Sequence, residues 1–168
     1  MTDVVSRALE RLPAPGAAAP NPAPYEPLLG AWDVEWCTLD EQGRAGHRIR
    51  GEWHFTRILG GNGVQDVIWA TGSAPESAGT TLRCWDSAQG VWRAVFMSPA
   101  DGEFVSLIGR PAPDGIRQQV VDPVTRPGVR EWNFSRIEGS SFRWQARTSE
   151  DGGGTWRTTH EIWARRQR

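Results

Sequence analysis

The chain has no lysine: all 19 of its basic side chains are arginines. A mechanism that forms a Schiff base on lysine is therefore excluded. Cysteine is also scarce, since Cys37 and Cys84 are the only two. They form no CxxC pair and have no metal-ligand spacing, so we expect two free thiols and no metal site.

An excess of charge of either sign is missing too. The 19 basic and 20 acidic side chains give a net charge of −1, which lacks the basic footprint of a nucleic-acid-binding chain. No apolar run approaches the ~18 residues of a membrane span, and the mean hydropathy is −0.52. The stretch 1–11 lacks the apolar core of a secretory signal. We therefore predict a soluble cytoplasmic protein with neither nucleic acid nor membrane as partner.

The 168 residues suit one ordinary domain behind an N-terminal arm. Apolar residues at roughly helical spacing predict a short helix over 2–12. The stretch 13–27 is rich in proline and alanine, which predicts an extended linker without chemistry of its own. We assign 1–27 to this helix and Pro/Ala-rich arm, and 28–168 to the folded domain.

Beyond residue 28 the chain alternates short runs of Trp, Val, Ile, Phe and Thr with Gly, Asp and Asn turn signals. This punctuation is typical of an antiparallel β meander. With no segment long enough for a crossover helix, the pattern predicts an all-β, up-and-down barrel that closes to remove its edges; the alternative is a two-sheet sandwich. The predicted strands are about 30–39, 46–58, 63–71, 79–85, 91–97, 103–110, 115–121, 129–137, 141–148 and 156–165.

Alternation along these strands predicts which side chains face inward, because successive residues point to opposite faces. The predicted interior is aromatic. A barrel of about eight strands is filled by its own side chains, whereas a larger one encloses a cavity. We therefore expect a site for a small apolar or aromatic molecule, and indole faces also suit flat ligands and cations. The predicted ligand-binding residues are Trp36, Trp53, Phe55, Trp132, Phe134, Trp144 and Trp156.

Three polar residues fall on the inward phase of their strands and are the predicted catalytic groups. Asp66 and His160 would form an acid/base couple, and Arg93 would stabilise negative charge developing on a carbonyl. A slipped register would place Asp66 and Arg93 outside. His160 has two other interpretations, a hydrogen-bonded interior histidine or an axial haem ligand.

Two groups of residues resemble a known superfamily. The first strand is similar to the Gly-x-Trp strand of the lipocalin and calycin superfamily, and the two later turns resemble a bacterial lipocalin-like family of unknown function. These segments are Leu28-Leu29-Gly30-Ala31-Trp32-Asp33-Val34-Glu35, then Ile58-Leu59-Gly60-Gly61, and Ser149-Glu150-Asp151-Gly152-Gly153-Gly154-Thr155-Trp156.

The resemblance spans about 28–166 and implies a barrel around a cavity for small apolar ligands. A few members of the superfamily are cofactor-free cyclases or isomerases, or haem carriers. Lipocalins also pack a basic residue after the last strand across the Gly-x-Trp indole, which implies that Arg165 or Arg166 packs on Trp32.

The prediction for function is binding of a small apolar or aromatic metabolite in the barrel. Cofactor-free acid/base chemistry of a cyclase, isomerase or dehydratase would accompany it, because such enzymes hold a flexible substrate in a reactive shape. Two alternatives stay open, a haem-binding barrel with His160 as axial ligand and a non-catalytic interaction module. A homodimer is the default among oligomers.

Overall fold

The computed structural model describes residues 24–121 and 128–168. The helix predicted over 2–12 lies outside these residues, as does most of the predicted linker. Ten strands are present: β1 (Gly30–Thr38), β2 (Ile49–Ile58), β3 (Gly63–Ala70), β4 (Gly79–Asp86), β5 (Val91–Ser98), β6 (Glu103–Ala112), β7 (Gly115–Val120), β8 (Val129–Ser135), β9 (Ser141–Ser149) and β10 (Arg157–Arg166). Three short 3-10 helices complete the described elements: η1 (Glu26–Leu28), η2 (Leu59–Gly61) and η3 (Pro75–Ser77).

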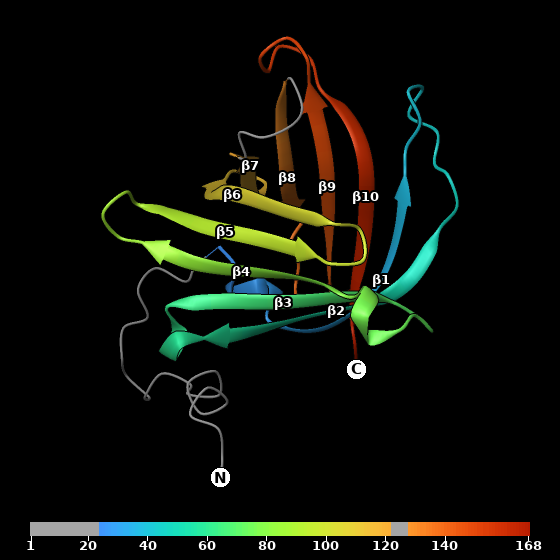
Figure 1. Ribbon diagram of the computed structural model, residues 1–168. Helices are drawn as coiled ribbons and strands as arrows, with labels where there is room; N and C mark the ends of the chain where they lie inside the picture. The colour runs from blue at the N-terminus through green and yellow to red at the C-terminus, as the bar shows by residue number, and fades with distance from the viewer. Residues whose placement is uncertain (1–23, 122–127) are drawn as a thin grey trace.

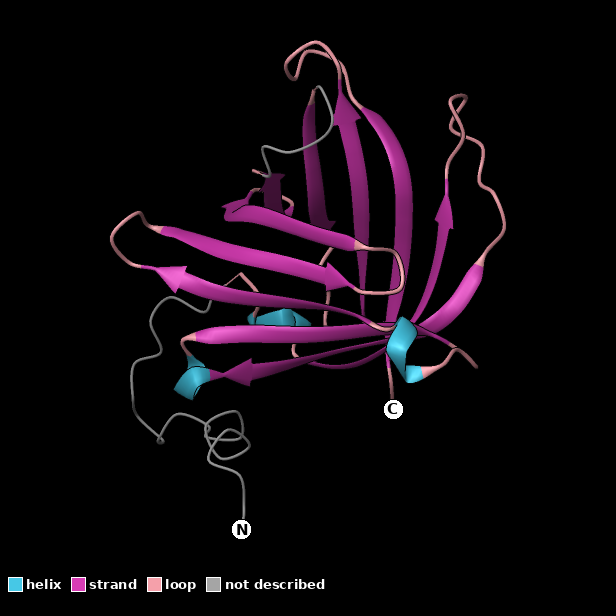
Figure 2. Ribbon diagram, in the orientation of Figure 1, coloured by secondary structure: helices cyan, strands magenta, loops and turns pink. Residues whose placement is uncertain are grey.

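The strands form one closed antiparallel barrel in which each strand pairs with its sequence neighbours (Figure 1). Pairing of β1 with β10 closes the ring, with Trp32 opposite Arg166 and Trp36 opposite Ile162. The predicted all-β, up-and-down barrel is therefore confirmed, and the two-sheet sandwich is wrong. Figure 2 shows how little helix accompanies the strands. Both cysteines are free, as expected.

The two ends of the barrel differ because the turns alternate between them. One end carries η1, the turns β2–β3, β4–β5, β6–β7 and β8–β9, and the end of β10. The other end carries the remaining described turns, including the long β1–β2 and β9–β10 connections seen at the top of Figure 1. We call the first the closed end and the second the mouth.

The closed end is held by an arginine lying on a tryptophan. The guanidinium of Arg166 lies 4.1 Å from the centre of the Trp32 ring, and it donates hydrogen bonds to the carbonyls of Leu29, Pro27 and Gly139. The Trp32 indole is fully buried and donates to the Leu28 carbonyl at 2.6 Å. Of the two arginines that the lipocalin resemblance offers, Arg166 is the partner of Trp32.

The contact between Arg166 and Trp32 also requires glycine at the start of β1. Gly30 has φ +112, a conformation that other residues rarely adopt, and an added Cβ would lie 2.9 Å from Nη1 of Arg166. In the Gly-x-Trp pattern of this chain, the glycine leaves room for Arg166 and the tryptophan packs against it.

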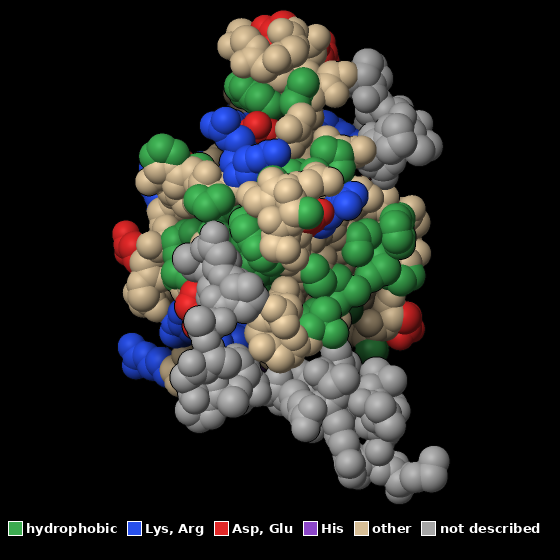
Figure 3. Space-filling view, turned by 90° about the vertical axis from the view of Figure 1, so that its left-hand side faces the viewer, with side chains coloured by type: hydrophobic (Ala, Val, Ile, Leu, Met, Phe, Trp, Pro, Cys, Tyr) green, Lys and Arg blue, Asp and Glu red, His purple; other side chains and the backbone are tan. Residues whose placement is uncertain are grey.

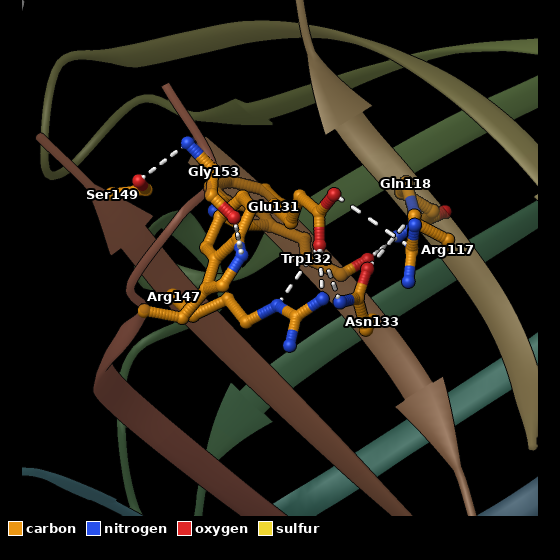
Figure 4. A network of polar contacts seen from close by, with 9 residues as sticks. Arg117, Gln118, Glu131, Trp132, Asn133, Arg147, Ser149 and Gly153 are labelled. Carbon is orange, nitrogen blue, oxygen red and sulfur yellow. Dashed lines mark hydrogen bonds and ion pairs between the residues drawn. The ribbon is translucent and has the colours of Figure 1, made fainter. Parts of the chain in front are cut away.

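Strands β7–β9 carry an ionic cluster (Figure 4). The Glu131 carboxylate is buried and accepts hydrogen bonds from Nε and Nη2 of Arg147, at 2.9 and 2.6 Å, and from Asn133 at 3.0 Å. Arg117 approaches the same carboxylate at 3.7 Å. Arg147 also lies 4.4 Å from the centre of the Trp156 ring. These contacts cross-link the neighbouring strands of this wall.

The turn between β9 and β10 is ordered by one carboxylate. Asp151 accepts hydrogen bonds from the Ser149 and Thr155 hydroxyls and from the Thr155 backbone N–H. These hydrogen bonds hold the pKa of Asp151 well below its ordinary value. The Ser149 hydroxyl in turn accepts from the Gly153 N–H at 2.8 Å. One rim of the mouth is therefore a fixed structure.

Replacing Arg166 should destabilise the barrel far more than replacing its neighbour. We expect Arg166→Ala to lower the free energy of unfolding by about 2 to 3 kcal/mol, because a cation–π contact and hydrogen bonds to three backbone carbonyls are lost together. Arg165→Ala, which changes an exposed side chain of the same strand, should stay within about 0.5 kcal/mol. Denaturant unfolding followed by tryptophan fluorescence measures both. Equal losses would contradict the closing role of Arg166.

Candidate functional site

A cavity of about 800 Å³ occupies the interior and opens at the mouth. Its upper and middle walls are aromatic and aliphatic, as the sequence pattern predicts. The apolar side chains that line it are Trp36, Trp53, Ile68, Trp69, Ala70, Phe96, Leu107, Trp132, Trp144, Ala146 and Ile162. A cavity of this size falls within the range of small-molecule sites.

The aromatic walls are built from rings that fix one another edge-on. The Trp132 ring packs against Phe96 at 5.3 Å and 75°, and against Trp144 at 5.7 Å and 69°. Trp144 in turn packs against Trp53, with their ring centres 6.3 Å apart. Edge-to-face packing is a favoured arrangement of aromatic pairs. These side chains are therefore held in place before any ligand arrives.

Two glycines make room for these rings. An added Cβ at Gly51 would lie 2.6 Å from Cζ3 of Trp36, and one at Gly79 would lie 2.8 Å from the Phe96 ring. Both glycines lie within strands, where glycine usually signals a close approach of this kind.

Below the cavity, a layer of buried aromatic side chains fills the closed end. Tyr25 and Leu28 from the segment before β1 are fully buried there. The Tyr25 ring meets Trp92 at 5.1 Å and Phe134 at 6.3 Å, both edge-on. Tyr25 belongs to the stretch 13–27 predicted as a linker without chemistry, and for this residue that prediction is wrong: it plugs the barrel.

Between the plug and the cavity lies a buried polar cluster, which we call the floor: Asp66, Arg83, Gln118 and the Tyr25 hydroxyl. Asp66 and Arg83 are 1% and 2% exposed and form an ion pair through Oδ2 and Nη1. Gln118 Oε1 accepts hydrogen bonds from the Tyr25 hydroxyl at 3.0 Å and from Nε of Arg83 at 3.3 Å. Gln118 Nε2 donates to the Trp132 carbonyl at 2.9 Å. Asp66, Arg83 and Gln118 all line the cavity.

The Arg83 guanidinium is also surrounded by ring faces. It lies 5.1 Å from the centre of the Tyr25 ring and 5.8 Å from those of Phe55 and Phe134. Aromatic faces attract a cation, most strongly where water is excluded. These rings, Asp66 and Gln118 together compensate the burial of the charge.

Two polar atoms near this floor have no partner among the described residues: Oδ1 of Asp66 and Nε1 of Trp53. Both side chains line the cavity and both are buried. Buried polar groups are almost always hydrogen-bonded, so an acceptor and a donor left over at one site require an explanation.

The mouth carries the exposed polar residues of the cavity lining. They include Ser77, Asp101, Glu103, Glu150, Arg157 and His160. Nδ1 of His160 lies 3.1 Å from the Thr159 hydroxyl. Burial by the cavity wall lowers the pKa of His160, and the Glu103 carboxylate partly opposes this shift.

Of the seven predicted ligand-binding residues, Trp36, Trp53, Trp132 and Trp144 line the cavity. Phe55 and Phe134 face inward but lie in the packed layer around Arg83. Trp156 is not among the lining residues, and the prediction that it faces inward is wrong. The register of β10 shifts between Thr158 and His160, and an extra residue in a strand reverses the faces before it. Trp156 instead packs on Arg147.

Of the three predicted catalytic residues, Asp66 is at the floor and His160 is at the mouth. Arg93 is outside: its side chain is 64% exposed and faces Asp86 at 3.7 Å. The inward prediction for Arg93 is wrong because the buried Trp92 and Ala94 and the cavity-lining Phe96 define the inner phase of β5.

Asp66 and His160 are not brought together as a couple. His160 pairs with Thr38, whereas Asp66 aligns through Phe55 with Gly30. Thr38 and Gly30 are the two ends of β1, which is about 26 Å of strand at ~3.3 Å per residue. The acid/base couple predicted from alternation therefore has its members at opposite ends of the site.

The floor residues Arg83 and Gln118 are the main omission of the sequence-based prediction. A signal for Arg83 was present, because the inward positions of β4 run Gly79, Thr81, Arg83. Its partner Asp66 is on the adjacent strand, diagonal to it in the register. No local signal shows that Gln118 and Tyr25 reach the same point.

No family model matches the chain, and no curated protein matches it. The closed barrel with an arginine on the Gly-x-Trp indole is consistent with a lipocalin-like barrel. Within the described ranges, no helix is long and apolar enough to cross a membrane, and no group of His, Cys, Asp and Glu side chains could hold a metal ion.

The single tyrosine of the chain should titrate far above its ordinary range. Burial raises the pKa of Tyr25 to about 12, with Arg83 only partly opposing the shift, whereas an unfolded tyrosine titrates near pH 10. Because the folded state holds this proton more tightly, the stability contributed is complete below about pH 10 and is lost as pH rises toward 12.

Tyr25 is the only tyrosine among the 168 residues, so phenolate absorbance in the near ultraviolet reports this group alone. We expect phenolate to appear only together with loss of near-ultraviolet circular dichroism. Titration near pH 10 in the folded protein would show that the plug is open to water. Tyr25→Phe supplies the spectral blank.

Proposed function

We propose that this barrel binds a small apolar or aromatic molecule in its central cavity. The observation that carries the proposal is an interior of about 800 Å³ walled by aromatic side chains and open at one end. A closed barrel that served only as a rigid module would gain stability by filling this space, since cavities cost packing energy.

The walls favour a flat ligand. Trp36, Trp53, Trp132 and Trp144 reach the cavity from four different strands, β1, β2, β8 and β9. A planar molecule among them gains stacking as well as burial, and because the rings already hold one another it orders few side chains on binding.

A neutral probe should bind at one site and depend on the cavity tryptophans. We expect N-phenyl-1-naphthylamine to gain fluorescence on saturable binding, and Trp144→Ala to weaken its Kd about tenfold through lost ring contact. The matched control is Trp163→Ala, which removes an indole of the outer face that packs on Arg48 and should leave the Kd unchanged. Equal weakening in the two variants, or no saturation, would refute a cavity site.

We also propose, as a second candidate, that Asp66 acts as a base on a bound carbonyl compound, in line with the predicted cofactor-free cyclase, isomerase or dehydratase. The specific observation is that its Oδ1 has no donor among the described residues, in a side chain that lines the cavity beside Arg83. Arg83 would take the role predicted for Arg93, beside a developing negative charge. His160, at the mouth, would have only an auxiliary role.

Proton abstraction can be followed without the natural substrate. The protein should accelerate exchange of the α-protons of 1-tetralone in deuterated water, and Asp66→Asn should lose about tenfold or more of this acceleration. Proton NMR of the ketone measures it, and His160→Ala is the comparison that should retain most of the rate. If the wild-type protein and Asp66→Asn exchange alike, the basic role fails while ligand binding is untouched.

The haem-binding alternative rests on His160 alone. Because that side chain is exposed at the mouth, a porphyrin bound to it would sit at the opening and not among the indoles. For the homodimer expected by default, no contact surface has been assigned either. Exposed apolar side chains such as Phe104 and Leu59, 63% and 50% exposed, are the candidates for contact, and the face in Figure 3 intersperses hydrophobic with charged groups.

A further inference from the structure

The floor of the cavity specifies more than an apolar ligand. Its two unpartnered atoms are of opposite kinds: Oδ1 of Asp66 can only accept a hydrogen bond, and Nε1–H of Trp53 can only donate one. Both residues are at least nine-tenths buried, at 1% and 4% exposed, and both line the cavity.

The register places these two residues close together. Trp53 of β2 pairs with Ile68 of β3, and Asp66 lies two positions along the same strand. Trp53 and Asp66 are thus diagonal neighbours on the inner face, with Cα atoms about 7 to 8 Å apart. A single head group whose donor and acceptor atoms are bonded to the same carbon can span them.

The charge of the floor decides between neutral and ionised head groups. Asp66 and Arg83 cancel each other within their ion pair, and Gln118 and Tyr25 carry no charge. The other ionisable residues of the described lining belong to the mouth: Asp101, Glu103, Arg130, Arg147, Glu150, Arg157 and His160. An ionised head group would lose its hydration at the floor and find no uncompensated charge in return.

We propose that the cavity takes a neutral ligand with an amide-like head, a carboxamide or lactam, inserted toward the floor. The head N–H donates to Oδ1 of Asp66 and its carbonyl accepts from Nε1 of Trp53, while the aromatic body lies among Trp36, Trp132 and Trp144. This inference rests on the proposed ligand-binding function and adds the class of head group to it.

Other heads satisfy only half of the site. A carboxylate accepts from Trp53 but places its charge beside that of Asp66. An ammonium group donates to Asp66 but leaves the Trp53 N–H without an acceptor. A hydrocarbon leaves both atoms unpaired, which is costly at a buried site.

The test compares probes of one shape in calorimetric titrations: 2-naphthamide, 2-naphthoate, 2-naphthylmethylammonium and 2-methylnaphthalene. We expect 2-naphthamide to bind about tenfold or more tightly than each of the others, and to displace N-phenyl-1-naphthylamine. If 2-methylnaphthalene binds as tightly as 2-naphthamide, the head-group inference is overturned and the proposed function stands. If no probe binds, both fail.

Two tryptophan variants separate the donor from the ring. Trp53→Phe removes the indole N–H and keeps an aromatic side chain, so the affinity ratio of 2-naphthamide to 2-methylnaphthalene should fall to about threefold or less. Trp92→Phe is the matched control: Nε1 of Trp92 is also buried without a partner, but Trp92 is not among the cavity-lining residues. In Trp92→Phe the affinity ratio of 2-naphthamide to 2-methylnaphthalene should equal that of the wild type. An equal fall of this ratio in both variants overturns the inference.

Asp66→Asn tests the charge argument by reversing the preference. The variant leaves Arg83 without its counter-charge, so 2-naphthoate should now bind more tightly than 2-naphthamide. A thermal unfolding transition checks that this variant is folded. If it is not folded, the Trp53→Phe variant tests the proposal in its place. A folded Asp66→Asn that still prefers the amide would overturn the proposal.

Discussion

An arginine side chain keeps its charge at any depth in a protein, and the lower half of this barrel is arranged around that constraint. Arg83 is 2% exposed. Asp66 neutralises it, Gln118 accepts its Nε–H, and the rings of Tyr25, Phe55 and Phe134 present their faces to it. Gly109 is part of the same arrangement, because a Cβ there would lie 2.4 Å from the Tyr25 hydroxyl.

Stability alone does not require such a pair. Buried ion pairs replaced by apolar side chains of similar volume often leave a protein equally stable or more so. Here the pair lies where the packed aromatic layer gives way to the cavity, and one oxygen of its carboxylate is left without a donor. The same residues that close the barrel therefore give the cavity a polar end, so a ligand meets an apolar wall and a polar floor in turn.

The sequence predicted the strands to within three residues at every boundary, because turn residues and aromatic runs mark them locally. The inner faces of β1, β2, β8 and β9 were predictable from alternation for the same reason. Alternation failed in β5, where Val91, Val95 and Met97 are as apolar as the true inner set. It failed before His160, where the bulge reverses the faces. The floor was out of reach because Tyr25 and Gln118 lie 93 positions apart in the chain.

The closing contact also has a consequence for how the chain folds. Arg166 joins the last strand to Pro27 and Leu29, 139 and 137 positions away. During synthesis β1 emerges first and its edge toward β10 stays open until almost the whole domain has been made. Contacts this distant in sequence slow folding, and an unpaired edge in the interval invites association with other chains. Because the barrel cannot close until β10 has been made, molecular chaperones would encounter the nascent chain as an open sheet.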